Sequence, residues 1–152
     1  MDKSNTSSIR HVGFVVKDID TSLKFYSDIL GLEIYRRHTE EGGFIDKLTG
    51  INKVKLEWVK LIIPKGGLIE LLQYHSHPDP DISNGLNRNE SNRLGCSHVA
   101  LTVENLSTLH QEIISNGLSC KSEPLIAPGG KAKILYAHDP DGAILELIED
   151  LK

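Results

Sequence analysis

Two histidines and two glutamates are the residues of this sequence best suited to chemistry. His11 and His98 stand in apolar, β-branched stretches, and Glu70 and Glu146 lie inside the apolar runs LIELL and AILELI. An unpaired carboxylate in such surroundings is costly to bury, so each glutamate needs a compensating partner. Two neutral imidazoles and two carboxylates balance the charge of one divalent cation. This mixed nitrogen and oxygen set suits Ni, Zn, Co, Mn or Fe(II) and leaves coordination positions open.

The chain repeats itself around these four residues. The segment HVGFVVKDIDT, beginning at His11, aligns without gaps on HVALTVENLST, beginning at His98, at an offset of 87 residues. PKGGLIELL, which contains Glu70, aligns on PDGAILELI, which contains Glu146, at an offset of 76 residues. A single strand histidine is more often a hydrogen-bonded core residue than a ligand, and a single buried glutamate often pairs with Lys or Arg. Repetition in register favours a shared metal site instead.

Strand alternation shows why the histidines can reach a ligand. Side chains alternate between the two faces of a strand, so His11, Gly13 and Val15 share one face while the other face is wholly apolar. His98 and Ala100 occupy the equivalent face in the second half. The residue next to each histidine on that face is small, which leaves room beside the imidazole.

The elements that position these residues follow the same order in each half. In the first half a strand over 10–17 runs into a helix that starts near Asp20 and ends at Gly31, and strands follow at 32–37, 54–63 and 68–74. In the second half a helix capped by Asn105 or Ser107 ends at Gly117, with strands at 118–123, 132–138 and 143–149. Helical spacing, capping residues and turn chemistry at Gly66-Gly67 and 139–142 support this reading.

The sequence therefore predicts an α+β fold of paired βαβββ modules. The expected domains are a flexible tail over 1–8, a first module over 9–74, a linker over 75–94 and a second module over 95–150. Residues 39–53, the extra length of the first half, are expected to form a loop or short helix.

Composition narrows the function classes. With 39% hydrophobic and 25% charged residues, the chain is an ordinary globular protein of one-domain size. A net charge of −4 with scattered basic residues makes nucleic acid an unexpected partner. We expect no membrane span and no secretory signal, which predicts a cytoplasmic protein.

The stretches HVGFVVKDIDTSLKFYSDILGLEI, LIELL, HVALTVENL and DPDGAILELIE resemble the vicinal oxygen chelate superfamily. That superfamily includes glyoxalase I, methylmalonyl-CoA epimerase, extradiol dioxygenases and the fosfomycin and bleomycin resistance proteins. The resemblance covers roughly residues 9–149 and implies that the paired βαβββ modules form a curved mixed-sheet cup, which holds one divalent ion. Carried over position by position, it implies that the metal ligands are His11, Glu70, His98 and Glu146.

A His-Glu-His-Glu ligand set is similar to that of glyoxalase I. The resemblance implies a lyase or isomerase of the lactoylglutathione lyase type, in which a carboxylate removes the proton α to a metal-bound carbonyl. Glu146 and Glu70 are the candidate bases. His75 and His77, which follow the fourth strand, could line the mouth of the cup.

The sequence departs from the glutathione-using pattern at Val15 and Tyr74, where glyoxalase I carries an Arg and an Asn. This departure favours another thiol adduct of a 2-oxoaldehyde, an acyl-CoA or another 2-oxo compound. A methylmalonyl-CoA epimerase-like enzyme is the first alternative, and a metal-assisted binding or resistance protein without turnover is the second. Arg36 and Arg37 are candidates to reach an acidic substrate, although a solvated strand edge is the commoner role. We expect a homodimer, with cups closed either within one chain or between two.

Overall fold

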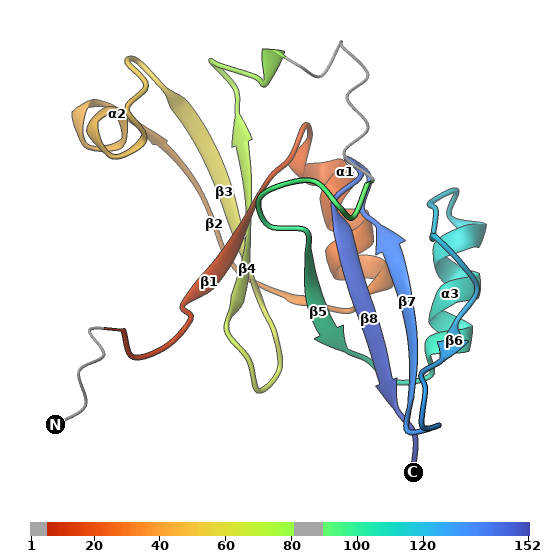
Figure 1. The fold of residues 1–152 in the computed structure, drawn as a ribbon. Helices are drawn as coiled ribbons and strands as arrows, with labels where there is room; N and C mark the ends of the chain where they lie inside the picture. Colours follow the sequence, from red (N-terminus) through yellow and green to blue (C-terminus); the bar gives the residue numbers. More distant parts are fainter. Residues whose placement is uncertain (1–5, 81–89) are drawn as a thin grey trace, which may run out of the picture. The chain divides into compact units, whose positions relative to one another are not determined.

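The structure, a computed structural model, describes residues 6–80 and 90–152. The predicted tail and linker therefore lie partly outside the described residues. Two four-stranded mixed sheets dominate the part described (Figure 1). The strands of sheet A are β1 (His11–Val15), β2 (Glu33–Glu41), β3 (Lys55–Ile62) and β4 (Leu68–Tyr74). The strands of sheet B are β5 (His98–Thr102), β6 (Leu125–Ile126), β7 (Ala132–His138) and β8 (Ile144–Asp150).

Both sheets have the same topology. Their strand orders are β1-β4-β3-β2 and β5-β8-β7-β6. In each, the first strand pairs in parallel with the last and the remaining pairs are antiparallel. The register is also repeated, because Gly13 lies opposite Glu70 and Ala100 lies opposite Glu146. The duplicated architecture predicted from the sequence is confirmed.

By internal contacts the chain divides into two compact units. The described residues of Met1–Ile19 and Leu32–Asp79 form unit 1, and Asp20–Gly31 with the described residues of Pro80–Lys152 form unit 2. Residues 20–31, the predicted helix of the first module, thus group with the second sheet. The domain boundaries that we expected from the sequence stay a prediction.

The helix between β1 and β2 is irregular. It begins as α1 (Ile19–Leu23) and continues as a π-helical stretch, η1 (Lys24–Ile29), in which Phe25 and Tyr26 are fully buried. Gly31, with a φ of 73°, stops the helix in the left-handed conformation that glycine adopts without steric cost. Within unit 2, η1 packs against α3 (Leu106–Ser115).

The N-terminus of helix α3 is capped by a residue that lies far along the sequence, on β8. Asn105 holds the N-cap position, but its side chain makes no capping hydrogen bond. The backbone N–H of Leu106 instead donates to Oε2 of Glu149 on β8, at 3.1 Å. This contact satisfies one of the free amides of the first turn, so α3 is fastened to the end of the strand that carries Glu146 (Figure 1).

The predicted strand over 118–123 is wrong. In this segment only Cys120 makes a bridge, to Ala137, and the strand that pairs with the outer side of β7 is the two-residue β6. Pro124 has no N–H to donate to a ladder, and the Ser122 hydroxyl donates to the carbonyl of Glu123, which gives this backbone a local alternative to pairing.

The extra residues of the first half form the short helix α2 (Gly43–Thr49). Its buried residue, Ile45, packs with Val54 and Leu56, and Tyr74 lies against this cluster. Asp46 accepts hydrogen bonds from the backbone N–H groups of Lys53 and Val54, which ties the helix to the start of β3. Among the described residues, no helix has the length and apolar character that a membrane crossing requires.

Candidate metal centre

The first predicted pair, His11 and Glu70, comes together within unit 1. Nε2 of His11 lies 3.1 Å from Oε2 of Glu70. The parallel pairing of β1 with β4 places both side chains on one face of sheet A, which we call its site face. The glutamate side chain is 12% exposed and the histidine 34%, so the carboxylate is the deeper partner.

The second pair repeats this geometry within unit 2. Nε2 of His98 lies 3.2 Å from Oε2 of Glu146, with side-chain exposures of 32% and 20%. Both side chains lie on the corresponding site face of sheet B. Nδ1 of His98 lies 3.2 Å from the hydroxyl of Ser97, and such a second bond fixes the ring orientation of a metal-binding histidine. The two halves therefore present nearly identical His–Glu pairs.

The donor atoms of each pair fit a divalent metal. Nitrogen and carboxylate oxygen bind such ions at about 2.1 Å, and two neighbouring donors at a right angle then stand about 3 Å apart. The measured separations of 3.1 Å and 3.2 Å match this value. Within the described residues no group of three or more His, Cys, Asp or Glu side chains is arranged to hold an ion. The candidate ligands therefore occur as one His–Glu pair in each unit.

The surroundings of the two glutamates differ. Oε1 of Glu70 has a cation partner, Nζ of Lys60, at 3.4 Å. In the described part of the chain His98 is the only basic partner of Glu146, and Tyr136 occupies the position that matches Lys60. Lys60 thus supplies part of the compensation for Glu70 that the sequence analysis assigned to an ion. Glu146, which has no lysine or arginine partner among the described residues, therefore has the greater need of a compensating cation.

Tyr136 gives the second site face an apolar character. Its ring centroid lies 5.1 Å from that of His98. Together with Ile134 it also lines a hollow of about 380 Å³, whose other wall comes largely from residues 125–128. Apolar surface of this kind favours an apolar ligand group beside the His98–Glu146 pair.

The turn before β8 is held by Asp139, whose side chain is almost fully buried. Its Oδ1 accepts from the backbone N–H groups of Asp141 and Ala143, and its Oδ2 accepts from the hydroxyl of Tyr26 at 2.9 Å. Burial raises the pKa of the Asp139 carboxyl, which the hydrogen bonds from Ala143 and Tyr26 oppose. This network sets the start of the strand that carries Glu146.

His138, next to this turn, is buried and has an unusual environment. Its Nδ1 pairs with the Ser119 hydroxyl at 2.8 Å, whereas its Nε2 has no hydrogen-bond partner among the described residues. Burial lowers the pKa of the imidazole, and the positive charge of Lys121 lowers it further. The neutral ring therefore belongs to the folded state.

His75 and His77, the histidines that follow the fourth strand, bond to residues other than the His11–Glu70 pair. Nε2 of His75 lies 2.8 Å from Glu57, on the face of sheet A opposite Glu70, and His77 bonds to the hydroxyl of Ser76. Burial alone would raise the pKa of Glu57, but hydrogen bonds from His75 and Arg37 outweigh it and lower that pKa. The predicted role of His75 at the mouth of the cup thus has a structural alternative.

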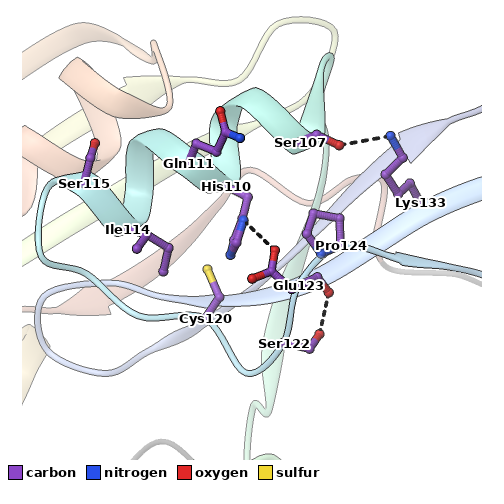
Figure 2. Close-up of a pocket in the computed structure, with 10 residues that line it drawn as sticks. All are labelled: Ser107, His110, Gln111, Ile114, Ser115, Cys120, Ser122, Glu123, Pro124 and Lys133. Atoms are coloured by element: carbon purple, nitrogen blue, oxygen red, sulfur yellow. Dashed lines mark hydrogen bonds and ion pairs between the residues drawn. The ribbon is translucent and has the colours of Figure 1, made fainter.

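A separate cavity of about 850 Å³ lies beside α3 in unit 2. Figure 2 shows Cys120 pointing toward His110, and Nδ1 of His110 lies 3.3 Å from Oε2 of Glu123. A thiol beside a histidine, which in turn contacts a carboxylate, is the arrangement of a cysteine nucleophile with its base. Burial, together with the charge of Glu123, raises the pKa of the Cys120 thiol to about 11, which keeps the sulfur protonated and unreactive at neutral pH.

Two residues on the site face of sheet A, Lys60 and Trp58, are not among the site residues that the sequence predicts. Both could have been found from the hairpin whose loop spans residues 63–67, because positions equally distant from the loop face each other across an antiparallel pair. That rule places Lys60 opposite Glu70, as the structure has it, and puts Trp58 on the same face. The alignment of the two halves would also have shown that this lysine is not repeated.

Comparisons with known proteins agree with this architecture. The model of the Glyoxalase/Bleomycin resistance protein/Dioxygenase superfamily matches residues 8–147. A probable lactoylglutathione lyase from Synechocystis is 29% identical over 140 residues, covering 91% of this chain and 92% of the relative. A lactoylglutathione lyase from Arabidopsis thaliana is 24% identical over 97% of this chain, which spans only 46% of that longer relative. The crystal structure of a glyoxalase family protein from Bacillus cereus, 23% identical, superposes with a TM-score of 0.88 over 100% of this chain and 99% of its own.

Proposed function

The chain belongs to the Glyoxalase/Bleomycin resistance protein/Dioxygenase superfamily, and from this we propose that it is a metal-dependent lyase or isomerase of the glyoxalase type. Its reaction is the removal of a proton α to a carbonyl group. One observation carries the proposal: the same His–Glu pair, with donor atoms 3.1 Å and 3.2 Å apart, recurs at matching positions of both sheets. The lactoylglutathione lyase names of relatives at 24–29% identity support it.

We propose that His11, Glu70, His98 and Glu146 together hold one divalent ion, either Ni, Zn, Co, Mn or Fe. The two pairs would come from one chain or from two chains of a homodimer. When bound, such an ion polarises the substrate carbonyl and acidifies the neighbouring C–H bond. Ser97 would orient the His98 ring through its Nδ1 atom, at 3.2 Å.

Glu146 is the stronger candidate for the base. A carboxylate accepts a proton more readily when no cation stabilises its charged form. Lys60 lies 3.4 Å from Glu70, whereas no lysine or arginine among the described residues pairs with Glu146. We therefore assign proton removal to Glu146, and to Glu70 the role of a ligand with the base role second.

The substrate is proposed to be a thiol adduct of a 2-oxoaldehyde other than the glutathione adduct. Glyoxalase I has an Arg and an Asn where this chain has Val15 and Tyr74. Tyr74 packs against the apolar cluster around Ile45 and Val54. The same two positions favour a second candidate, an epimerase acting on an acyl-CoA. A cytoplasmic location stays a prediction, which cell fractionation can check.

Turnover assays with purified, metal-loaded protein test the proposal. Methylglyoxal with glutathione, with coenzyme A or with other small thiols, and a chiral acyl-CoA, are supplied in parallel in deuterated water. We expect deuterium at the α position of one substrate class and its loss in the Glu146→Gln variant. Racemisation of the acyl-CoA alone would favour the epimerase. Tight binding of these compounds with no exchange would favour a binding protein and contradict the proposed reaction.

A further inference from the structure

The site face of sheet A carries a cluster of cations around the only tryptophan of the chain. The guanidinium carbon of Arg36 lies 5.6 Å from the centroid of the Trp58 ring, and Nζ of Lys60 lies 4.6 Å from it. The indole N–H donates to Oε1 of Glu40 at 3.1 Å. Cation–π contacts and this hydrogen bond hold the three side chains in a defined arrangement.

The register of the sheet explains why these residues meet. Arg36 lies directly opposite Lys60 across the β2–β3 pair, and Lys60 lies opposite Glu70 across the β3–β4 pair. Cross-strand partners share a face, and Trp58 stands two residues before Lys60 on the same side. The cation cluster is therefore continuous with Glu70, a proposed ligand of the ion.

The two cations of this cluster differ in their partners, and the nearby carboxylate of Glu40 bonds to the indole N–H. Lys60 pairs with Glu70, but among the described residues no carboxylate pairs with Arg36, whose contact is the indole ring. On the opposite face of the sheet, Arg37 is paired with Glu57 at 2.6 Å. Arg36 thus presents an exposed guanidinium beside the proposed centre, while its neighbour in sequence is satisfied.

The fold does not require this cluster. In sheet B the positions that match Trp58 and Lys60 are Ile134 and Tyr136, so neither side chain is repeated there. Lys121 lines the mostly apolar hollow beside Tyr136. The His–Glu pair is repeated in both sheets, but the lysine stacked on a tryptophan is not. A feature that one copy has and the other lacks is suited to recognising one end of an asymmetric ligand.

We propose that Arg36 and Lys60 form a subsite for an oxyanion, the carboxylate or phosphate group of the substrate. A guanidinium binds such groups with two parallel hydrogen bonds, and a lysine adds a point charge. Stacking on Trp58 restrains both cations before the ligand arrives, which lowers the entropy lost on binding. The subsite is defined by geometry alone; only its use by the substrate depends on the proposed function.

Tryptophan fluorescence tests the subsite without any turnover. Because Trp58 is the only tryptophan, an anion bound by Arg36 and Lys60 beside its ring should change the emission directly. The protein is titrated with malonate and with inorganic phosphate at constant ionic strength, using chloride as the reference. We expect a saturable change with at least one of them, and the tighter of the two identifies the preferred group.

Variants then locate the binding. Arg36→Gln and Lys60→Met should each weaken it by about tenfold or more, the loss of one charge-assisted contact. Arg37→Gln removes the same charge from the other face of the sheet and is the matched control. It should change the affinity for the anion less than twofold. Equal affinity in wild type and Arg36→Gln, or no saturable change at all, would overturn the inference. Because Arg36 does not contact Glu70, its variant also leaves metal binding intact.

The two proposals fail separately. Anion binding that depends on Arg36, in a protein that exchanges no α-proton, would keep the subsite and contradict the proposed reaction. If turnover is found, Arg36→Gln should raise KM for an anionic substrate with little change in kcat. An unchanged KM would contradict the role in substrate recognition while leaving the reaction standing.

Discussion

The hydroxyl of Tyr26 is expected to be a major source of stability in unit 2. It donates to Oδ2 of Asp139 at 2.9 Å, and both side chains are almost fully excluded from water. Through this bond the helical residues 20–31 are fastened to the turn that precedes β8. The Tyr26→Phe variant leaves the ring in place and removes only the donor, so the Asp139 carboxyl loses one of its three hydrogen bonds.

The expected cost follows from this geometry. A hydrogen bond to a charged group contributes roughly 1.5–3 kcal/mol, and an acceptor left buried without its donor is at the upper end of that range. For a protein of about 150 residues, each 1 kcal/mol lowers Tm by roughly 2–4 °C. We therefore expect Tyr26→Phe to lower Tm by about 6–12 °C.

Thermal unfolding followed by circular dichroism measures this shift. Tyr35→Phe is the matched control, because that side chain lies on β2 and is 63% exposed, so its Tm should stay within about 1 °C of wild type. A Tyr26→Phe variant as stable as Tyr35→Phe would show that water replaces the lost donor. The reasoning about a buried Asp139 carboxyl would then be refuted.

Three further outcomes are expected. The Glu146→Gln variant should lower the turnover rate by a factor on the order of 10² or more, with a much smaller loss of bound metal. The Glu70→Gln variant should lower the turnover rate less. Equal losses of steady-state rate in the two variants would mean that the glutamates share the base role. Removal of the metal with a chelator should lower the unfolding free energy by about 2.7 kcal/mol, compared with protein in a free metal concentration of about 100 times Kd. An unchanged Tm after verified metal loss would argue that the glutamates are satisfied without an ion. Because burial lowers the pKa of His138 below its ordinary 6.5, its stabilising contribution is complete above pH 6.5 and is lost as the pH falls below it. His138→Asn, which keeps a partner for Ser119, should flatten that part of the stability profile, and an identical profile in wild type and variant would exclude His138 as the cause.

How far the sequence predicts the fold depends on how strong the local pattern is. The strands over 68–74 and 132–138 were predicted with the bounds that β4 and β7 have, because apolar runs flanked by turn residues define both ends. β2 extends to Glu41, beyond the predicted end, because its last residues are polar and gain their pairing from β3 rather than from hydrophobicity. The π-helical stretch η1 leaves no distinct periodicity in the sequence.

The sequence likewise predicts one part of the candidate site and not the other. The two His–Glu pairs could be predicted because the duplication repeats them at fixed register, and strand alternation places each pair on one face. The difference between the two glutamates could not be read from the repeat, since Lys60 and Tyr136 act across a hairpin from positions ten residues before each glutamate. A pattern shared by both halves identifies the common chemistry, whereas pairing across strands determines what distinguishes them.

The metal content of the purified protein tests the central claim most directly. Elemental analysis of wild type, of His98→Ala and of the control His77→Ala, each prepared in the same way, compares a proposed ligand with a histidine that bonds to Ser76. We predict about one divalent ion per chain in wild type and in His77→Ala, and a large loss in His98→Ala. Full metal content in His98→Ala, or no stoichiometric metal in any of the three proteins, would contradict the proposed metal centre.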